Sequence, residues 1–314
     1  MLGNEYLRRE DSEGYSYRND VEEGKYNYLI KELKDIKKTA PSLSSVPTGT
    51  GLDELFYAIE FDERTGKTVK KPLGGLPRGG VFNLVGIADT GKSVFVEQFA
   101  VYHAGNGGKV LFVTVESPAE FLYMGFRQKA VALGMEFEDI ENNIVILDAS
   151  RSGEFRENIY TVIKTMEIAF EKKDCDLTII DSVTGFYEHK EILARQVVRV
   201  LFNFLKRNGQ TGIFISQKRS SQQAESAEAA GGLAVAHIVD GTIVFDKKLI
   251  ETKFDQSIYG LPIGGVLRTI RIDGCRLTAH SQETWVMTIE ENGLIQIKER
   301  LSDFTKNTSE KRRW

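Results

Sequence analysis

The sequence predicts an α/β fold in which a mostly parallel β-sheet is flanked by helices. Strand-like apolar stretches alternate with helical stretches from Val81 to Ile215, and parallel strands need helical crossovers of this kind. The chain has 314 residues, 41% of them hydrophobic, which is enough to bury the core of one large domain with appendages. The same composition excludes a chain that is disordered throughout.

The expected elements can be placed in order along the chain. Core strands are expected at residues 81–85, 110–115, 144–147, 177–180 and 211–215, and core helices at 93–104, 118–133, 154–172 and 190–206. Later strands are expected at residues 241–245, 267–272, 285–289 and 294–297. The last two flank the turn Glu291-Asn292-Gly293 and should form a C-terminal β-hairpin. Another hairpin is expected as an insertion at residues 56–73, around Arg64-Thr65-Gly66.

Segments on either side of the core should be appendages. We place the core domain at residues 46–300 and an N-terminal arm at residues 1–45. Between Tyr26 and Ile36 this arm has apolar residues at helical spacing, which predicts an appended helix. Such a helix either packs on the flank of the domain or clips two subunits together. Residues 301–314 are expected to form a flexible tail.

A glycine-rich loop joins the first core strand to the first core helix. It matches G-x-x-x-x-G-K-[ST], in which backbone N–H groups face an anion and the next helix contributes its positive N-terminal end. Lys92 would reach the β- and γ-phosphates of a nucleotide, and the Ser93 hydroxyl would hold Mg²⁺. The alternative is a glycine turn with a surface lysine. The predicted nucleotide-binding residues are Gly86, Ile87, Ala88, Asp89, Thr90, Gly91, Lys92 and Ser93.

Two acidic residues stand at the ends of predicted strands. Asp181 follows strand 177–180, at the edge where parallel sheets bind ligands, and is predicted to hold Mg²⁺ opposite Ser93. Its alternative role is to cap the turn or helix that follows. Glu116 follows strand 110–115 and is the predicted group that orients the attacking water in phosphoryl transfer. Alternatively, Glu116 belongs to the acidic first turn of the next helix.

Charge and cysteine content restrict the partners and the compartment. The 41 Lys and Arg against 45 Asp and Glu give a net charge of −4, which argues against broad attraction to polyanions but permits a local basic groove. Two cysteines, Cys175 and Cys275, are too few for a disulfide framework and suit a reducing compartment. No apolar run approaches the roughly 20 residues that cross a bilayer. We therefore expect a cytoplasmic protein without a membrane partner.

Several further motifs accompany the phosphate loop at compatible separations. They are the segments TGTGLDEL at 48–55, GGLPRGG at 74–80, FVTVESP at 112–118, IIDSVT at 179–184, GGLAVAHIVD at 231–240 and RLTAH at 276–280. In this order, over about residues 46 to 300, they resemble a single domain of the KaiC-like ATPases in the RecA superfamily of P-loop NTPases. Within this set, GGLAVAHIVD is similar to the stretch after the second mobile loop of RecA and RadA-like proteins. The tandem second domain of KaiC is absent from the sequence.

The resemblance implies a RecA-like P-loop NTPase core that binds ATP and Mg²⁺ and hydrolyses ATP. Glu116 would take the position of the catalytic glutamate and Asp181 that of the Walker B aspartate, while Gln217 would sense the γ-phosphate. Such proteins place the nucleotide between subunits, which implies a ring-forming homo-oligomer, with a hexamer as one candidate. Arg276 would then act in trans as an arginine finger. The alternative for Arg276 is a surface arginine without that role.

The chain also departs from the family pattern. Ser117 stands where KaiC carries a second glutamate and Gly274 where it carries a lysine, so we expect slow or differently organised hydrolysis. Asp89 adds a negative charge to the phosphate loop and should point outward.

One loop bears on the choice of partner. Residues 218–228 take the place of the DNA-contacting loop of RecA-like recombinases, but their two basic residues are balanced by two acidic ones and they contain no aromatic residue. A nucleotide-responsive surface that binds an unidentified protein is therefore favoured over nucleic acid. The alternatives are a DNA-binding recombinase paralogue and a nucleotide-binding module with negligible hydrolysis.

Overall fold

The computed structural model describes residues 27–188, 191–218 and 235–310. The chain divides into two units, residues 1–42 and 43–314. In the first unit, the described part contains the 3₁₀ turn η1 (Asn27–Leu29) and the helix α1 (Leu33–Ile36), neither with a buried residue. The longer helix expected here is thus reduced to two short turns, because an isolated helix of this length needs packing of an apolar face to be stable.

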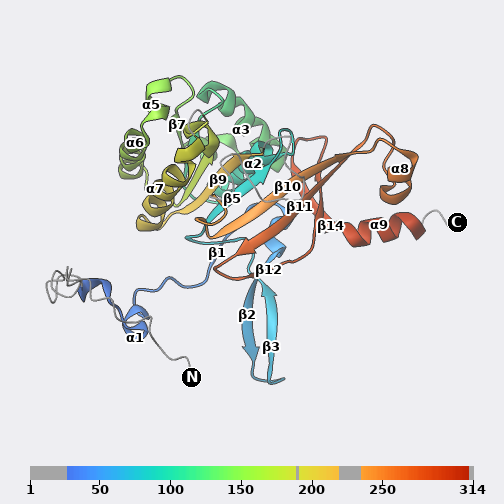
Figure 1. The fold of residues 1–314 in the computed structure, drawn as a ribbon, viewed down its shortest axis with the longest axis horizontal. Coiled ribbons are helices and arrows are strands. Elements are labelled where there is room, and N and C mark those ends of the chain that lie inside the picture. The colour runs from blue at the N-terminus through green and yellow to red at the C-terminus, as the bar shows by residue number, and fades with distance from the viewer. Residues whose placement is uncertain (1–26, 189–190, 219–234, 311–314) are drawn as a thin grey trace, which may run out of the picture. The chain divides into compact units, whose positions relative to one another are not determined.

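The second unit is built on a central sheet of nine strands among the described residues (Figure 1). The strand order is β14-β13-β11-β10-β5-β9-β8-β6-β7. Their bounds are Val81–Gly86 (β5), Val110–Thr114 (β6), Ile144–Asp148 (β7), Leu177–Asp181 (β8), Thr211–Gln217 (β9), Gly241–Leu249 (β10), Val266–Cys275 (β11), Trp285–Ile289 (β13) and Ile295–Arg300 (β14). Strands β5 to β10 pair in parallel, and β11, β13 and β14 extend the sheet in antiparallel. The predicted mostly parallel sheet and its C-terminal hairpin are confirmed.

Helices cover both faces of this sheet, because its parallel strands are apolar on both sides. One face packs against α2 (Lys92–Gly105), α3 (Ala119–Leu133) and α4 (Phe137–Glu141). The other packs against α5 (Gly153–Glu157), α6 (Ile159–Lys172), the 3₁₀ turn η3 (Val183–Phe186) and α7 (Ala194–Arg207).

The helix expected at residues 154–172 is divided in two. Asn158 has an extended backbone between α5 and α6, and its side chain accepts hydrogen bonds from the N–H groups of Tyr160 and Thr161. Asn158 therefore ends one helix and caps the next.

The remaining elements are short strands and 3₁₀ turns. Strands β2 (Phe56–Asp62) and β3 (Lys67–Pro72) form the expected inserted hairpin, and β12 (Ala279–His280) pairs with the base of β2. Strand β1 (Ser45–Val46) pairs with β4 (Leu76–Pro77), with the 3₁₀ turn η2 (Gly51–Glu54) between β1 and β2. A further 3₁₀ turn, η4 (Glu191–Leu193), precedes α7.

The C-terminal segment differs from the expected flexible tail. Residues Leu301–Glu310 form the helix α9, and residues 311–314 lie outside the described part of the chain. Leu301 and Phe304 pack with residues near α8 (Lys253–Tyr259) and β11, against the small apolar cluster Ile250, Leu267 and Val286. This burial holds the segment in a helix. No helix in the described ranges has the length and apolar character needed to cross a membrane.

Candidate functional site

The glycine-rich loop lies at the C-terminal end of β5, which pairs with β9 on one side and β10 on the other. A Cβ atom on Gly86 would come within 2.3 Å of the carbonyl oxygen of Phe245, so only glycine fits beside β10. Gly91 caps α2 with a φ of 103°, a left-handed conformation that glycine adopts without strain. The loop therefore turns sharply enough to direct the N-terminus of α2 toward its concave side.

Lys92 is the first residue of α2, and its side chain turns back onto this loop. Its Nζ donates hydrogen bonds to the carbonyl oxygens of Gly86 and Ile87, at 2.9 and 2.7 Å, and to Thr90 Oγ1 at 3.3 Å. Burial lowers the pKa of the Lys92 ammonium to about 8, while the negative charge of Asp181 opposes this shift. The side chain is still a cation at neutral pH, as a phosphate ligand requires.

Asp89, the acidic residue inside the loop, points outward as expected. Its side chain is exposed, and its Oδ2 lies 3.7 Å from Nζ of Lys247 on β10. Its φ of 60° is left-handed, which aspartate tolerates better than most residues. The Asp89 carboxylate thus points into solvent, although its negative charge still acts on Lys92.

Asp181 lies beside the start of α2. Burial raises the pKa of Asp181 to about 6, a hydrogen bond from the Ser93 hydroxyl lowers it, and the negative charge of Glu116 raises it further. A buried carboxylate next to a hydroxyl suits Mg²⁺, which commonly takes one or two protein oxygen ligands and completes its shell with phosphate oxygens and water. Ser93 and Asp181 therefore fit the predicted metal site.

Glu116 and Gln217 come together at the same edge of the sheet, although 101 positions separate them in the sequence. Glu116 Oε1 accepts a hydrogen bond from Gln217 Nε2 at 2.9 Å and another from Ser182 Oγ at 2.7 Å. The backbone N–H of Gln217 in turn donates to Thr184 Oγ1 at 3.2 Å. Sequence reasoning missed the roles of Ser182 and Thr184, although both lie in the segment IIDSVT and carry hydroxyls one and three residues after Asp181.

Arg276 lies near the N-terminal ends of the parallel strands, opposite the ends that carry the phosphate loop. It follows β11, whose last residue, Cys275, pairs with Gly241 at the start of β10, and Gly241 pairs with Phe82 at the start of β5. Arg276 Nη2 donates to the carbonyl oxygen of His237 at 2.8 Å. The four-residue rise from Phe82 to Gly86 alone separates the two places by about 13 Å. The structure thus does not bring Arg276 to the phosphate loop of its own subunit.

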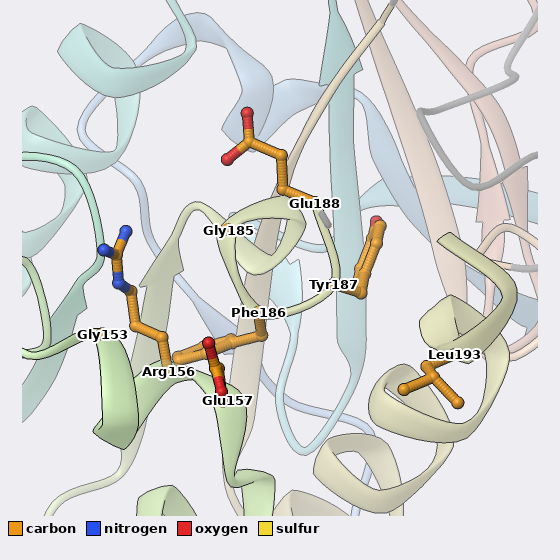
Figure 2. A pocket seen from close by; sticks show the side chains of 8 residues that line it. All are labelled: Gly153, Arg156, Glu157, Gly185, Phe186, Tyr187, Glu188 and Leu193. Carbon is orange, nitrogen blue, oxygen red and sulfur yellow. The ribbon is translucent and has the colours of Figure 1, made fainter. Parts of the chain in front are cut away.

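A separate pocket lies on the face of the sheet covered by α5 and η3 (Figure 2). Its lining includes Arg156 and Glu157 of α5, Phe186 of η3, and Tyr187 just beyond it. These residues do not belong to the glycine-rich loop, so this pocket is distinct from the predicted nucleotide site.

The segment expected to take the place of a DNA-contacting loop, residues 218–228, lies outside the described residues except for Lys218.

The sheet order and the loop after β5 define a P-loop NTPase of the RecA type. More specifically, the chain belongs to the KaiC ATPase family, whose family model matches residues 46–302. It is 26% identical over 237 residues to a UPF0273 protein of Pyrococcus furiosus, covering 71% of this chain and 87% of that protein. It is 24% identical to a UPF0273 protein of Thermotoga maritima, covering 71% and 89%.

A solved structure supports the same assignment. The KaiC-like protein PH0186 from Pyrococcus horikoshii superposes with a TM-score of 0.60 at 25% sequence identity, over 82% of this chain and 100% of that protein. The chain is accordingly a single KaiC-like domain of a nucleotide-binding ATPase family.

Replacing Lys92 by alanine should weaken ATP binding by at least about tenfold, because the variant lacks the cation that faces the β- and γ-phosphates. Titration calorimetry with ATP and Mg²⁺ measures this loss. Lys173→Ala is the control, because Lys173 follows α6 and its Nζ donates to the backbone carbonyl oxygen of Asn142, just before the start of β7. Equal ATP affinity of the Lys92 variant and the wild type would refute the assigned site.

Asp181 should make the stability of the nucleotide-free protein depend on pH. Its pKa is about 6 in the folded protein against 3.8 ordinarily, so the folded state holds this proton more tightly. The contribution of Asp181 to stability is therefore largest below about pH 4 and is lost as the pH rises through about 6. Asp181→Asn cannot ionise, so it should exceed the wild type in free energy of unfolding at about pH 8, with the difference shrinking toward pH 4.

Urea unfolding across this pH range, without nucleotide or Mg²⁺, measures that difference. Asp89→Asn, which changes an exposed carboxylate in the same loop, is the control. A difference between Asp181→Asn and the wild type that stays constant with pH would contradict the raised pKa.

Proposed function

We propose that the protein is a slow, Mg²⁺-dependent ATPase whose nucleotide state controls a ring-forming homo-oligomer and a surface that binds another protein. The observation that carries this proposal is the position of Glu116. Two hydrogen bonds, from Ser182 and Gln217, hold its carboxylate at the sheet edge that also carries the phosphate loop and Asp181. Phosphoryl transfer needs this kind of positioning more than covalent help.

The residues around the loop divide the work of hydrolysis. Lys92 would hold the β- and γ-phosphates, and Ser93 with Asp181 would hold Mg²⁺, which neutralises charge on the phosphate oxygens when bound. Glu116 would orient the attacking water and attract its proton. Because Glu116 Oε1 already accepts two hydrogen bonds, its Oε2 is the oxygen that we assign to the water.

Gln217 offers a path from the nucleotide to the surface. Its side chain binds Glu116, its backbone binds Thr184, and it stands at the end of β9, directly before Lys218 and the segment proposed to respond to nucleotide. A new contact between Gln217 and a γ-phosphate would compete with the bond to Glu116. Loss of the γ-phosphate on hydrolysis would therefore change the contacts of Gln217 with η3 and with the segment that follows β9.

The position of Arg276 supports an assembly. The Arg276 guanidinium lies at the ends of the strands opposite the phosphate loop, so it cannot stabilise charge on a phosphate held by its own subunit. It can do so if a neighbouring subunit places its phosphate loop beside these strand ends. The absence of a second glutamate at Ser117 and of a lysine at Gly274 is the reason for proposing a slow rate.

Mass and phosphate release should be measured together on the purified protein, with and without ATP and Mg²⁺. We expect the mass of the assembly to rise with ATP and phosphate release to be slow and dependent on Mg²⁺. The measurement is repeated with single-stranded DNA. Stimulation of turnover by DNA would favour a recombinase paralogue, and ATP binding without phosphate release would favour a binding module.

A further inference from the structure

The hairpin β2–β3 exposes two large apolar side chains on one face. Tyr57, Ile59 and Phe61 alternate along β2 and so share this face; Ile59 and Phe61 are 55% and 67% exposed. Lys70 of β3 pairs with Ile59, and its ammonium lies over the half-buried Tyr57 ring, 3.5 Å from the ring centre. Figure 1 shows the hairpin extending away from the central sheet, and in the described part of the chain only its base pairs with another strand, β12. A two-stranded ribbon is at best marginally stable in water, so packing of this face against another surface would stabilise the hairpin.

A second exposed apolar row lies on α3. Phe121, Met124 and Val131 are spaced to share one side of the helix, and they are 68%, 64% and 69% exposed. The exposed Gln128 lies on the same side, between Met124 and Val131. The opposite side of α3, with Leu122 and Phe126, is packed into the core. The row is therefore a free surface of a helix that is otherwise firmly seated.

Each surface begins beside one of the two groups that the proposed function brings together in a composite site: Arg276 of one subunit and Glu116 of its neighbour. Strand β12 starts three residues after Arg276 and pairs with the base of the hairpin at Tyr57, while α3 starts three residues after Glu116. If Arg276 reaches the site of a neighbour, the base of its hairpin is brought to the start of the neighbour's α3. This step rests on the proposed function.

The two surfaces also match in length. From Tyr57 to Phe61 the hairpin face rises about 14 Å. From Phe121 to Val131 the row on α3 rises about 15 Å. An alignment that starts at the composite site therefore places Phe61 against Val131.

Charges at the far ends are complementary. At the tip of the hairpin, Arg64 and Lys67 form no ion pair with any described residue. Of the acidic residues of the hairpin, Glu60 pairs with Lys71, and Asp62 accepts hydrogen bonds within the turn, which leaves one carboxylate, at residue 63, against these cations. Beyond the end of α3 follow acidic residues that form no ion pair within the described ranges: Glu136, Glu138, Asp139 and Glu141.

We propose that the β2–β3 hairpin of one subunit packs along α3 of the neighbouring subunit. The face of Tyr57, Ile59 and Phe61 covers the row of Phe121, Met124 and Val131, and the basic tip faces the acidic residues at 136–141. The hairpin thus fixes the distance between the arginine of one subunit and the phosphate loop of the next.

Disulfide crosslinking between differently tagged subunits tests this register. Phe61→Cys subunits are mixed with Val131→Cys subunits in ATP and Mg²⁺, oxidised mildly, and analysed for mixed dimers by mass. The expected result is a crosslink between these two that exceeds the one formed with Phe121→Cys, which lies at the wrong end of the row. Phe254→Cys, on the exposed surface of α8, and the wild type with its own cysteines measure the background.

A substitution on the same face gives a second readout. Ile59→Ser with Phe61→Ser should raise the dissociation constant of the assembly by about tenfold or more, while the ATP affinity of the single subunit, measured at concentrations too low for assembly, is unchanged. Phe254→Ser, which removes an equally exposed aromatic ring, should leave assembly unchanged.

The outcomes separate this inference from the proposed function. If the wild type assembles with ATP but the Phe61–Val131 crosslink stays at background and the serine variant assembles normally, the hairpin contact is refuted and the proposed function stands. A crosslink of Phe61→Cys that forms preferentially with Phe121→Cys would refute the register. If the wild type remains monomeric with ATP and Mg²⁺, both proposals fail.

Discussion

Replacing Glu116 by glutamine should lower the rate of ATP hydrolysis by about 10²-fold or more and leave ATP affinity nearly unchanged. The amide oxygen of glutamine can still accept the hydrogen bonds from Ser182 and Gln217, so the side chain keeps its place. What the variant lacks is the negative charge that attracts the proton of the attacking water. Phosphate release at saturating ATP and Mg²⁺ measures the rate, and calorimetry measures the affinity.

A nearby glutamate provides the control. Glu120 is exposed and pairs with Arg151 on the surface, so Glu120→Gln should hydrolyse ATP at the wild-type rate. If Glu116→Gln is as fast as Glu120→Gln, another group orients the water and the proposed role of Glu116 is wrong.

Replacing Arg276 by alanine should have the larger effect on hydrolysis, approaching the loss of about 10³-fold at the low end for arginine fingers. ATP binding should persist, because Arg276 lies at the edge of the sheet opposite its own phosphate loop. Arg207→Ala is the control, since Arg207 is an exposed arginine at the end of α7. Phosphate release by Arg276→Ala at the rate of this control would leave Arg276 without a role in the reaction.

The parallel core was predictable because its signals are local. Each buried strand is a short apolar run, and each is followed by a helical pattern before the next run begins. The C-terminal helix was missed for the opposite reason. Leu301 and Phe304 have helical spacing, but the cluster that they pack against comes from Ile250, directly after β10, and from β11 and β13, and it exists only in the folded domain.

The predicted site residues were found from two kinds of signal. The loop around Lys92 is one contiguous motif, while Glu116 and Asp181 each end an apolar strand, and parallel strands end at one edge. Contacts across the sheet gave no sequence signal. The bonds from Ser182 and Gln217 to Glu116 depend on the order β9-β8-β6, which no local pattern contains. The position of Arg276 likewise follows from the antiparallel direction of β11.

Subunit mixing tests whether ATP is hydrolysed at a site shared by two subunits. Arg276→Ala subunits, which keep Glu116, are combined with Glu116→Gln subunits, which keep Arg276, and phosphate release is measured in ATP and Mg²⁺. Mass analysis of differently tagged subunits checks that mixed assemblies form. We expect part of the lost activity to return, because some interfaces then contain both functional groups. Mixed assemblies that form and remain as inactive as either variant alone would contradict a shared site.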